Sequence, residues 1–152
     1  MNVLVTGGAG FIGSHIVDLL VKNDYKVSII DNLSHGKKEN INPKAVFYEM
    51  DIRNEKISEV FEKEKPEFVI HNAAQISVPN SIVDPVNDAS INIMGTINVL
   101  EAARKFNIKK IVYPASAAIF GEPSYLPIDE DHPLEMLSGY GVTKHTVEHY
   151  LK

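Results

Sequence analysis

The amino-acid sequence predicts an α/β fold built on a doubly wound, parallel β-sheet. Apolar runs typical of strands alternate with helical periodicity along the chain, and a glycine-rich turn separates the first run from the first helical segment. Alternating strands and helices form parallel sheets with right-handed crossovers. With 152 residues and no repeat or linker, we expect 1–152 to be one domain with a sizeable core.

The individual elements follow from short apolar runs and from apolar residues at helical spacing. Pro66 ends one helical segment, and Pro85 lies in the first turn of another, where a missing N–H costs little. In chain order we expect a strand over Asn2–Thr6, a helix over Phe11–Asn23, strands over Lys26–Asp31 and Ala45–Glu49, a helix over Glu55–Lys65, a strand over Glu67–His71, a long helix over Asp84–Asn107, a strand over Lys110–Tyr113 and a helix from Tyr140 to the end.

Composition and chain ends exclude several classes of protein. The net charge of −5 argues against nucleic-acid and anionic-membrane partners, and the absence of cysteine excludes disulfide and thiolate chemistry. The six histidines are scattered, so we expect no metal site. A first strand at Asn2 leaves no room for a signal peptide, and no apolar run reaches membrane-spanning length, which favours a cytoplasmic protein. The last helix has no stop signal, so we expect a fragment of a longer protein.

A glycine-rich loop lies between the first strand and the first helix. It satisfies G-x-G-x-x-G from Gly8 and G-x-x-G-x-x-G from Gly7. Glycine permits the tight turn and lets a pyrophosphate approach the backbone, while the following helix N-terminus attracts the anion. A glycine turn without a ligand is the alternative, but the flanking strand and helix favour a dinucleotide site. The residues we expect to hold it are Gly7, Gly10, Phe11, Ile12 and Gly13.

An acidic residue ends the second strand. Asp31 lies eighteen residues after Gly13, where a carboxylate would accept hydrogen bonds from the adenosine ribose. It would repel a 2′-phosphate, so NAD is favoured over NADP. Lys37 and Lys38 follow closely and leave NADP open.

Three motifs together resemble the extended short-chain dehydrogenase/reductase family: the glycine loop, Asp31-Asn32-Leu33-Ser34-x-Gly36, and Tyr140-x-x-x-Lys144. Within its NAD-dependent epimerases and dehydratases, the chain looks most like the UDP-glucose 4-epimerases, from Met1 to Lys152. The resemblance implies a Rossmann-type fold whose C-terminal part is absent, with NAD as cofactor and possible homodimers. The family's sugar-nucleotide pocket comes mostly from that absent part, so we expect the 152-residue chain alone to be inactive.

The resemblance also assigns further cofactor-binding residues. It places Asn32, Leu33, Ser34 and Gly36 around the adenosine end, Asp51 and Ile52 at the adenine, and Ala73, Ala74 and Gln75 beside the pyrophosphate and nicotinamide ribose. Asn92 helps to order the active site in such enzymes. Each has a simpler alternative: Asp51 as a helix cap, Ala73-Ala74 as tight packing, and Asn92 as a satisfied buried amide. Asn72 replaces a residue that is commonly apolar.

Tyr140 and Lys144 are the proposed catalytic pair. Four residues apart on a helix, they share one face, and a neighbouring ammonium favours the phenolate form of a tyrosine. By resemblance, Tyr140 and Lys144 also contact the cofactor, and the segment ending at Gly121 places Ser116 at the catalytic serine position. Pro114 and Ala115 replace two serines of the family pattern, and Pro114 predicts that the fifth strand ends early or bulges.

Ala117 and Ala118 favour one reaction of the family. Related dehydratases and decarboxylases carry an acidic residue after the catalytic hydroxyl, whereas epimerisation needs only a hydride and one proton moved out and back. We therefore expect an isomerase of galactose metabolism that epimerises a nucleotide sugar, a UDP-hexose such as UDP-glucose or UDP-galactose. The alternatives are an NAD(H)-binding module without catalysis and another nucleotide-sugar oxidoreductase of the family, which would release NADH.

Overall fold

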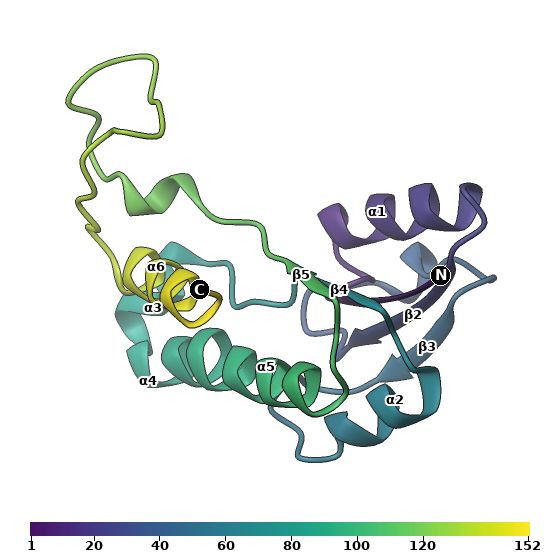
Figure 1. Cartoon of the computed structure of the whole chain (residues 1–152). Helices are drawn as coiled ribbons and strands as arrows, with labels where there is room; N and C mark the ends of the chain where they lie inside the picture. The colour runs from purple at the N-terminus through teal and green to yellow at the C-terminus, as the bar shows by residue number, and fades with distance from the viewer. The chain divides into compact units, whose positions relative to one another are not determined.

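A computed structural model describes residues 1–152 and shows two compact units, which are treated separately. Unit 1 comprises Met1–Ala74 and Gly95–Pro114, and unit 2 comprises Gln75–Met94 and Ala115–Lys152. Figure 1 shows the helices and strands of both units along the chain. None of the helices combines the length and apolar character that a membrane span needs.

Unit 1 is built on a five-stranded sheet in the order β3-β2-β1-β4-β5. All neighbouring strands are parallel, and Val5 of the central strand lies between Ile29 and Ile70. The prediction of a doubly wound parallel sheet is therefore confirmed. The strands are β1 (Asn2–Thr6), β2 (Lys26–Asp31), β3 (Val46–Glu49), β4 (Phe68–His71) and β5 (Lys110–Val112).

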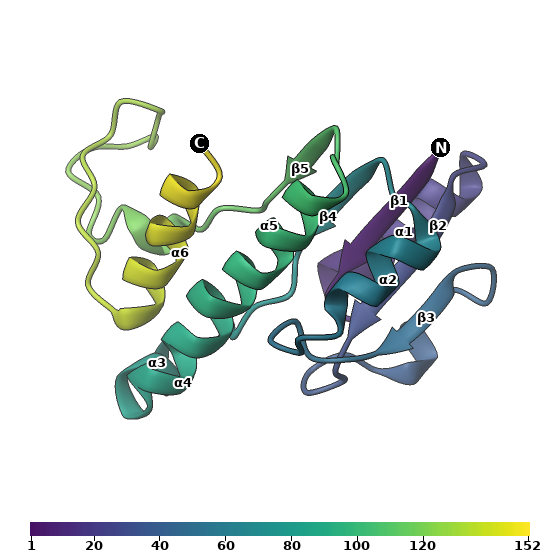
Figure 2. The ribbon, with the colours of Figure 1, turned by 60° about the horizontal axis from the view of Figure 1, so that its bottom comes forward.

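Helices cover both faces of this sheet. Figure 2 shows α2 (Ile57–Glu64) and α5 (Thr96–Lys105) over one face and α1 (Phe11–Lys22) over the other. Val17 of α1 is fully buried in a cluster of valine and isoleucine side chains from β1 and β2. On the opposite face, Phe61 of α2 stacks on Phe106, with ring centroids 6.2 Å apart. These apolar layers hold the carboxyl ends of the strands at one edge of the sheet.

Unit 2 is helical, and its central element is α6 (Gly139–Tyr150). This helix packs against α3 (Val78–Val83), α4 (Pro85–Ala89) and the 3-10 turn η3 (Ala117–Ile119). Each helix begins at a side-chain cap: the Ser77, Asp84 and Ser138 side chains accept backbone N–H hydrogen bonds. Such caps typically stabilise a helix by about 1 kcal/mol.

The predicted single helix over 84–107 is wrong. The chain forms α4, then a π-helical stretch η2 over Ser90–Gly95, then α5. A π-turn widens the regular hydrogen-bond ladder, which sequence periodicity does not reveal, and such turns are frequent at functional sites. The helix α3 was not predicted because it spans only six residues and contains Pro79. The last strand β5 ends at Val112, short of Pro114 as expected.

Asn72 directly follows β4. The nitrogen and the oxygen of its side-chain amide are both buried, and neither has a hydrogen-bond partner. A buried polar group without a partner costs about 1–3 kcal/mol. We therefore expect Asn72→Leu to leave the unfolding free energy unchanged or to raise it by about 1 kcal/mol, as measured by urea denaturation. Asn92→Leu is the matched contrast, because Asn92 is hydrogen-bonded within unit 2, and it should destabilise.

Candidate functional site

The glycine loop of unit 1 connects β1 to α1, and neighbouring backbone atoms leave no room for side chains at two of its glycines. Gly7 has a φ of +67°, and a Cβ there would lie 2.7 Å from the Ala73 nitrogen. A Cβ on Gly13 would lie only 2.1 Å from the Gly7 carbonyl oxygen. The Gly7 N–H donates to the Ile30 carbonyl at 2.8 Å, which ties the loop to β2. Glycine is therefore required at Gly7 and Gly13 for steric reasons.

The N-terminus of α1 faces an open surface. No side chain caps it at Gly10, so its first N–H groups remain available to a ligand. Phe11 and Ile12, the first helical residues, are 81% and 57% exposed. An uncapped helix start after a glycine turn is suited to an anion, because the N–H donors and the helix dipole both favour negative charge. The residues present thus fit the diphosphate of a dinucleotide.

Asp31 ends β2 next to this loop and is 8% exposed. Its two carboxylate oxygens accept hydrogen bonds from the Ala9 N–H at 3.0 Å and the Leu33 N–H at 2.8 Å. A carboxylate has about four acceptor sites, so both oxygens keep capacity for a further donor such as a ribose hydroxyl. A Cβ on Gly36 would come within 2.8 Å of the same carboxylate, so the loop that contains Asn32, Leu33 and Ser34 folds closely over Asp31.

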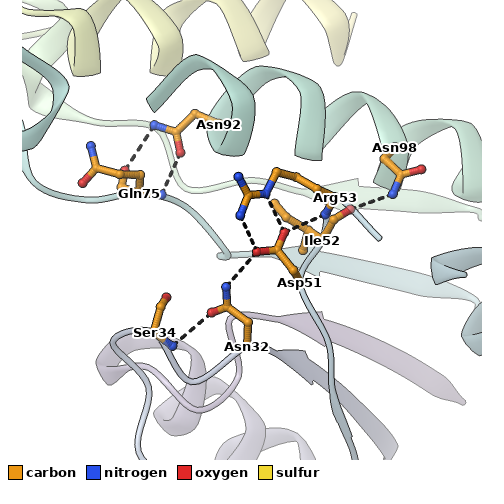
Figure 3. Close-up of polar contacts among 8 residues, drawn as sticks. All are labelled: Asn32, Ser34, Asp51, Ile52, Arg53, Gln75, Asn92 and Asn98. Carbon is orange, nitrogen blue, oxygen red and sulfur yellow. Dashed lines mark hydrogen bonds and ion pairs between the residues drawn. The ribbon is translucent and has the colours of Figure 1, made fainter. Parts of the chain in front are cut away.

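Asp51, after β3, is the centre of a second polar cluster in unit 1 (Figure 3). It accepts two hydrogen bonds from the Arg53 guanidinium, at 2.9 and 2.8 Å, and one from the Asn32 amide at 2.9 Å. The Arg53 side chain is the main reason that the pKa of Asp51 is lowered to about 2. Asn32 in turn accepts from the Ser34 N–H at 3.1 Å. Asp51 thus joins the loops after β2 and β3. Sequence reasoning missed its partner Arg53.

Asn98 on α5 fixes the backbone beside Asp51 (Figure 3). Its amide donates to the carbonyls of Ile52 at 2.7 Å and of Asn54 at 2.9 Å. Ile52 is buried, and a Cβ on Gly95 would lie 2.6 Å from its side chain. Ile52 is therefore a packing residue whose position depends on α5. Sequence reasoning missed Asn98.

His71, at the end of β4, is almost fully buried between two threonines. Its ring nitrogens contact the Thr6 hydroxyl at 2.6 Å and the Thr96 hydroxyl at 2.9 Å. The Thr6 hydroxyl also accepts from the Ala73 N–H at 3.2 Å. This chain of contacts orients the backbone of Ala73 and Ala74 as it leaves β4. The alanines thus lie where the sheet ends, next to Gly7.

In unit 2, Asp88 of α4 is fully buried and receives three hydrogen bonds. The Gln75 amide donates at 2.7 Å, the Asn92 amide at 3.1 Å and the Thr143 hydroxyl at 2.8 Å. Gln75 and Asn92 also exchange two hydrogen bonds through the Gln75 backbone, as Figure 3 shows. Since Thr143 lies between Tyr140 and Lys144 on α6, Asp88 holds the helix that carries both. Sequence reasoning missed Asp88.

Replacing Asp88 tests this arrangement. Asp88→Leu would remove the acceptor of the Gln75 and Asn92 amides, whereas the Thr143 hydroxyl could still donate to the Tyr140 carbonyl at 3.1 Å. We therefore expect the unfolding free energy to fall by about 3 kcal/mol. Asp88→Asn should cost less, because its remaining oxygen still accepts from Gln75 and Asn92. Urea denaturation measures both losses, and exposed Asp131→Asn should change stability by less than about 0.5 kcal/mol. Equal stability of Asp88→Leu and the parent chain would contradict the role of the network.

The predicted catalytic residues all lie in unit 2. The Ser116 hydroxyl caps η3 by accepting the Ala118 N–H at 3.2 Å. A Cβ on Gly141 would lie 2.6 Å from the Ala118 carbonyl, so η3 closely contacts the first turn of α6. Tyr140 lies in that turn and is half-buried, whereas Lys144 one turn later is only 4% exposed. The structure thus brings Ser116, Tyr140 and Lys144 onto two elements packed together.

Burial lowers the pKa of Lys144 to about 8, although the nearby Glu148 carboxylate acts in the opposite direction. The unfolded chain therefore binds more protons than the folded chain between pH 8 and about 10.5. Below pH 8 the burial of the charged Lys144 side chain lowers the free energy of unfolding by its full amount. This cost diminishes as the pH rises through that window. A buried cation kept at such a cost is typical of functional sites.

Lys144→Met keeps the length of the side chain and removes its charge. We expect it to stabilise the chain by about 1–3 kcal/mol at pH 7 and to lose most of that gain near pH 10.5, because the folded parent lysine is then neutral and the unfolded one is half deprotonated. Denaturant midpoints at pH 7 and at high pH measure this difference. Lys44→Met, at an exposed position, is the control and should show no such pH-dependent gain. A stabilisation that is independent of pH would contradict the explanation.

The parallel sheet, the glycine turn before α1 and the acidic residue after β2 define the Rossmann-type class of α/β proteins. Within it, a sequence model of the NAD dependent epimerase/dehydratase family matches residues 3–152. The chain belongs to that family.

Relatives of known name agree with this assignment. The chain is 56% identical over 151 residues to a Methanocaldococcus jannaschii protein provisionally named UDP-glucose 4-epimerase, covering 99% of this chain and 50% of that protein. The UDP-glucose 4-epimerase of Thermotoga maritima, solved with UDP-glucose, is 45% identical with a TM-score of 0.95. That of Thermus thermophilus, solved with NAD, is 42% identical with a TM-score of 0.94; both comparisons cover 99% of this chain and 50% of the solved chain. The chain thus spans about half the length of these relatives.

Proposed function

We propose that this chain is the NAD-binding, N-terminal half of an NAD-dependent nucleotide-sugar 4-epimerase acting on a UDP-hexose. The observation that carries the proposal is the packing of the Ser116-capped turn η3 on the first turn of α6, which holds Tyr140 and Lys144. The relatives named as UDP-glucose 4-epimerases, one of them solved with UDP-glucose, support the substrate class.

Unit 1 supplies the residues proposed to hold the dinucleotide. Gly7, Gly10 and Gly13 with the start of α1 would bind the pyrophosphate, since the turn is free of side chains and the helix start is uncapped. Asp31 would accept hydrogen bonds from the adenosine ribose, and its negative charge favours NAD over NADP. The loop residues Asn32 to Gly36 and the pair Asp51-Ile52 would surround the adenosine end.

Unit 2 supplies the residues proposed for proton transfer. NAD, when bound, would take up a hydride from the sugar carbon and return it to the opposite face. Tyr140 would remove the proton from the sugar hydroxyl and later return it, after the keto sugar has rotated. Ser116 would donate a hydrogen bond to that oxygen, and the Lys144 ammonium would favour the phenolate form of Tyr140. Ala117 and Ala118 after Ser116 offer no acid for elimination, which favours epimerisation.

A hydride-uptake assay with the full-length protein separates the alternatives. We expect UDP-galactose to be converted to UDP-glucose without net accumulation of NADH. An NAD(H)-binding module without catalysis, which the early end of β5 and Pro114 favour, would give neither product nor NADH. Net NADH accumulation would instead indicate a nucleotide-sugar oxidoreductase.

The 152-residue chain alone should bind NAD and show little or no epimerase turnover. Fluorescence titration with NADH measures the first property, and measurable turnover of this chain would contradict the second. Homodimer formation remains a prediction of the family resemblance, and a cytoplasmic location remains a prediction from the sequence. Size-exclusion chromatography of the full-length protein tests the dimer.

A further inference from the structure

Two histidines on α6 lie outside every role proposed above. His145 and His149 are four residues apart near the C-terminal end of α6, a spacing that places them on the same side of the helix. Their Nε2 atoms share a hydrogen bond of 3.1 Å, and the two rings meet edge to face with centroids 4.7 Å apart. His149 is exposed and His145 is partly exposed, so solvent and dissolved ions reach the pair.

The separation of the two nitrogens matches the bite of a metal chelate. Imidazole nitrogens bind zinc at about 2.0–2.1 Å, so two of them in a tetrahedral site lie roughly 3.3 Å apart. The observed 3.1 Å differs from this value by a few tenths of an ångström. A small rotation of the exposed His149 ring would point both lone pairs at one ion. Two histidines one turn apart on a helix face is also the arrangement of helical zinc motifs.

A carboxylate orients one of these rings. Glu148 Oε2 lies 3.2 Å from His145 Nδ1, the nitrogen remote from His149. A carboxylate at Nδ1 favours the tautomer that carries its proton there, which leaves Nε2 free to bind a metal. The same carboxylate adds negative charge beside the pair, which further favours a cation. The contact of Glu148 with His145 therefore has the geometry of an outer-shell partner in a metal site.

We propose that His145 and His149 chelate a divalent transition-metal ion such as Zn²⁺ or Ni²⁺ through their Nε2 atoms, with water at the remaining positions. The structure brings no third histidine, aspartate or glutamate into coordinating range, so the chain provides two ligands. A structural zinc site has four ligands, and this pair supplies two. Half of the binding free energy of such a site corresponds to a dissociation constant of roughly 1–200 μM. The expectation of no metal site treated the histidines as scattered and overlooked this pair. The inference does not depend on the proposed epimerase activity.

Calorimetric titration of the tag-free 152-residue chain with ZnCl₂, and separately with NiCl₂, tests the site. We expect one ion per chain at micromolar concentrations. His149→Ala should weaken binding at least tenfold, because a single imidazole remains. The double variant His149→Ala/Tyr150→His keeps six histidines but places the second ring five residues from His145, where it cannot share an ion, and it should weaken binding equally. Exposed His35→Ala should bind as the parent chain does.

Circular dichroism should show the parent helix content in these variants, since residues 149 and 150 are exposed. The proposal is wrong if the parent chain shows no saturable binding at these concentrations, or if His149→Ala binds like the parent. Parental affinity in the double variant would also overturn it, because the ion would then be held by exposed histidines without regard to their spacing.

Discussion

Gly13→Ala should weaken NAD binding by the 152-residue chain at least tenfold and lower its stability. The added methyl group would lie 2.1 Å from the Gly7 carbonyl oxygen, a contact that only a shift of the loop or of α1 can relieve. Inserting a methyl group into a packed site costs about 1–3 kcal/mol, occasionally more. The same shift would move the helix N-terminus away from the pyrophosphate, and each 1.4 kcal/mol of lost binding is about tenfold in affinity. We expect at least tenfold weaker binding in an NADH fluorescence titration.

Two further variants separate folding from ligand binding. A Cβ on Gly10 would lie 3.3 Å from the Gly7 carbonyl oxygen, so Gly10→Ala should cost little stability. It would nevertheless place a methyl group where the pyrophosphate approaches the backbone and should weaken NADH binding. Leu19→Ala, on the exposed side of the same helix, should leave binding unchanged. Parental NADH affinity in Gly13→Ala would show that the loop is not the dinucleotide site.

The sheet and the glycine loop could be predicted from sequence because both depend on local signals. Buried parallel strands read as short apolar runs, and Gly13 is constrained by atoms of Gly7 and Gly8, a few residues earlier in the same loop. The spacing of Tyr140 and Lys144 predicts a shared helix face whatever surrounds it, and α6 includes both. These features need little knowledge of tertiary contacts.

The features that sequence reasoning missed depend on contacts between distant segments. Asp88 reads as an exposed helical residue, and only the approach of Gln75 and Thr143 makes it a buried acceptor. Arg53 reads as a solvated side chain, although it pairs with Asp51. The π-turn η2 has the same apolar pattern as a regular helix, so the continuous helix was the natural but wrong prediction. Buried polar networks are thus the part of this protein that periodicity describes least well.

Tyr140→Phe in the full-length protein should reduce kcat by about 10²- to 10⁴-fold, the usual contribution of general acid–base catalysis. The substitution removes one hydroxyl and keeps the ring, so the packing of α6 on η3 is preserved. Because Asp88, Thr143 and Asn92 hold α6 independently of that hydroxyl, we expect the unfolding midpoint to match the parent within error. The measurement is the initial rate of conversion of UDP-galactose to UDP-glucose, with the midpoint recorded on the same preparation.

The matched control is Tyr150→Phe, which removes the same hydroxyl from an exposed tyrosine on the same helix and should leave kcat unchanged. Ser116→Ala should reduce kcat as well, and the double variant with Tyr140→Phe should lose less than the product of the two single losses, because both groups would act on one oxygen. Retained turnover in Tyr140→Phe would refute the assignment of the base while leaving NAD binding by unit 1 intact. The phenol of Tyr140 therefore separates a working epimerase site from a dinucleotide-binding module that only resembles one.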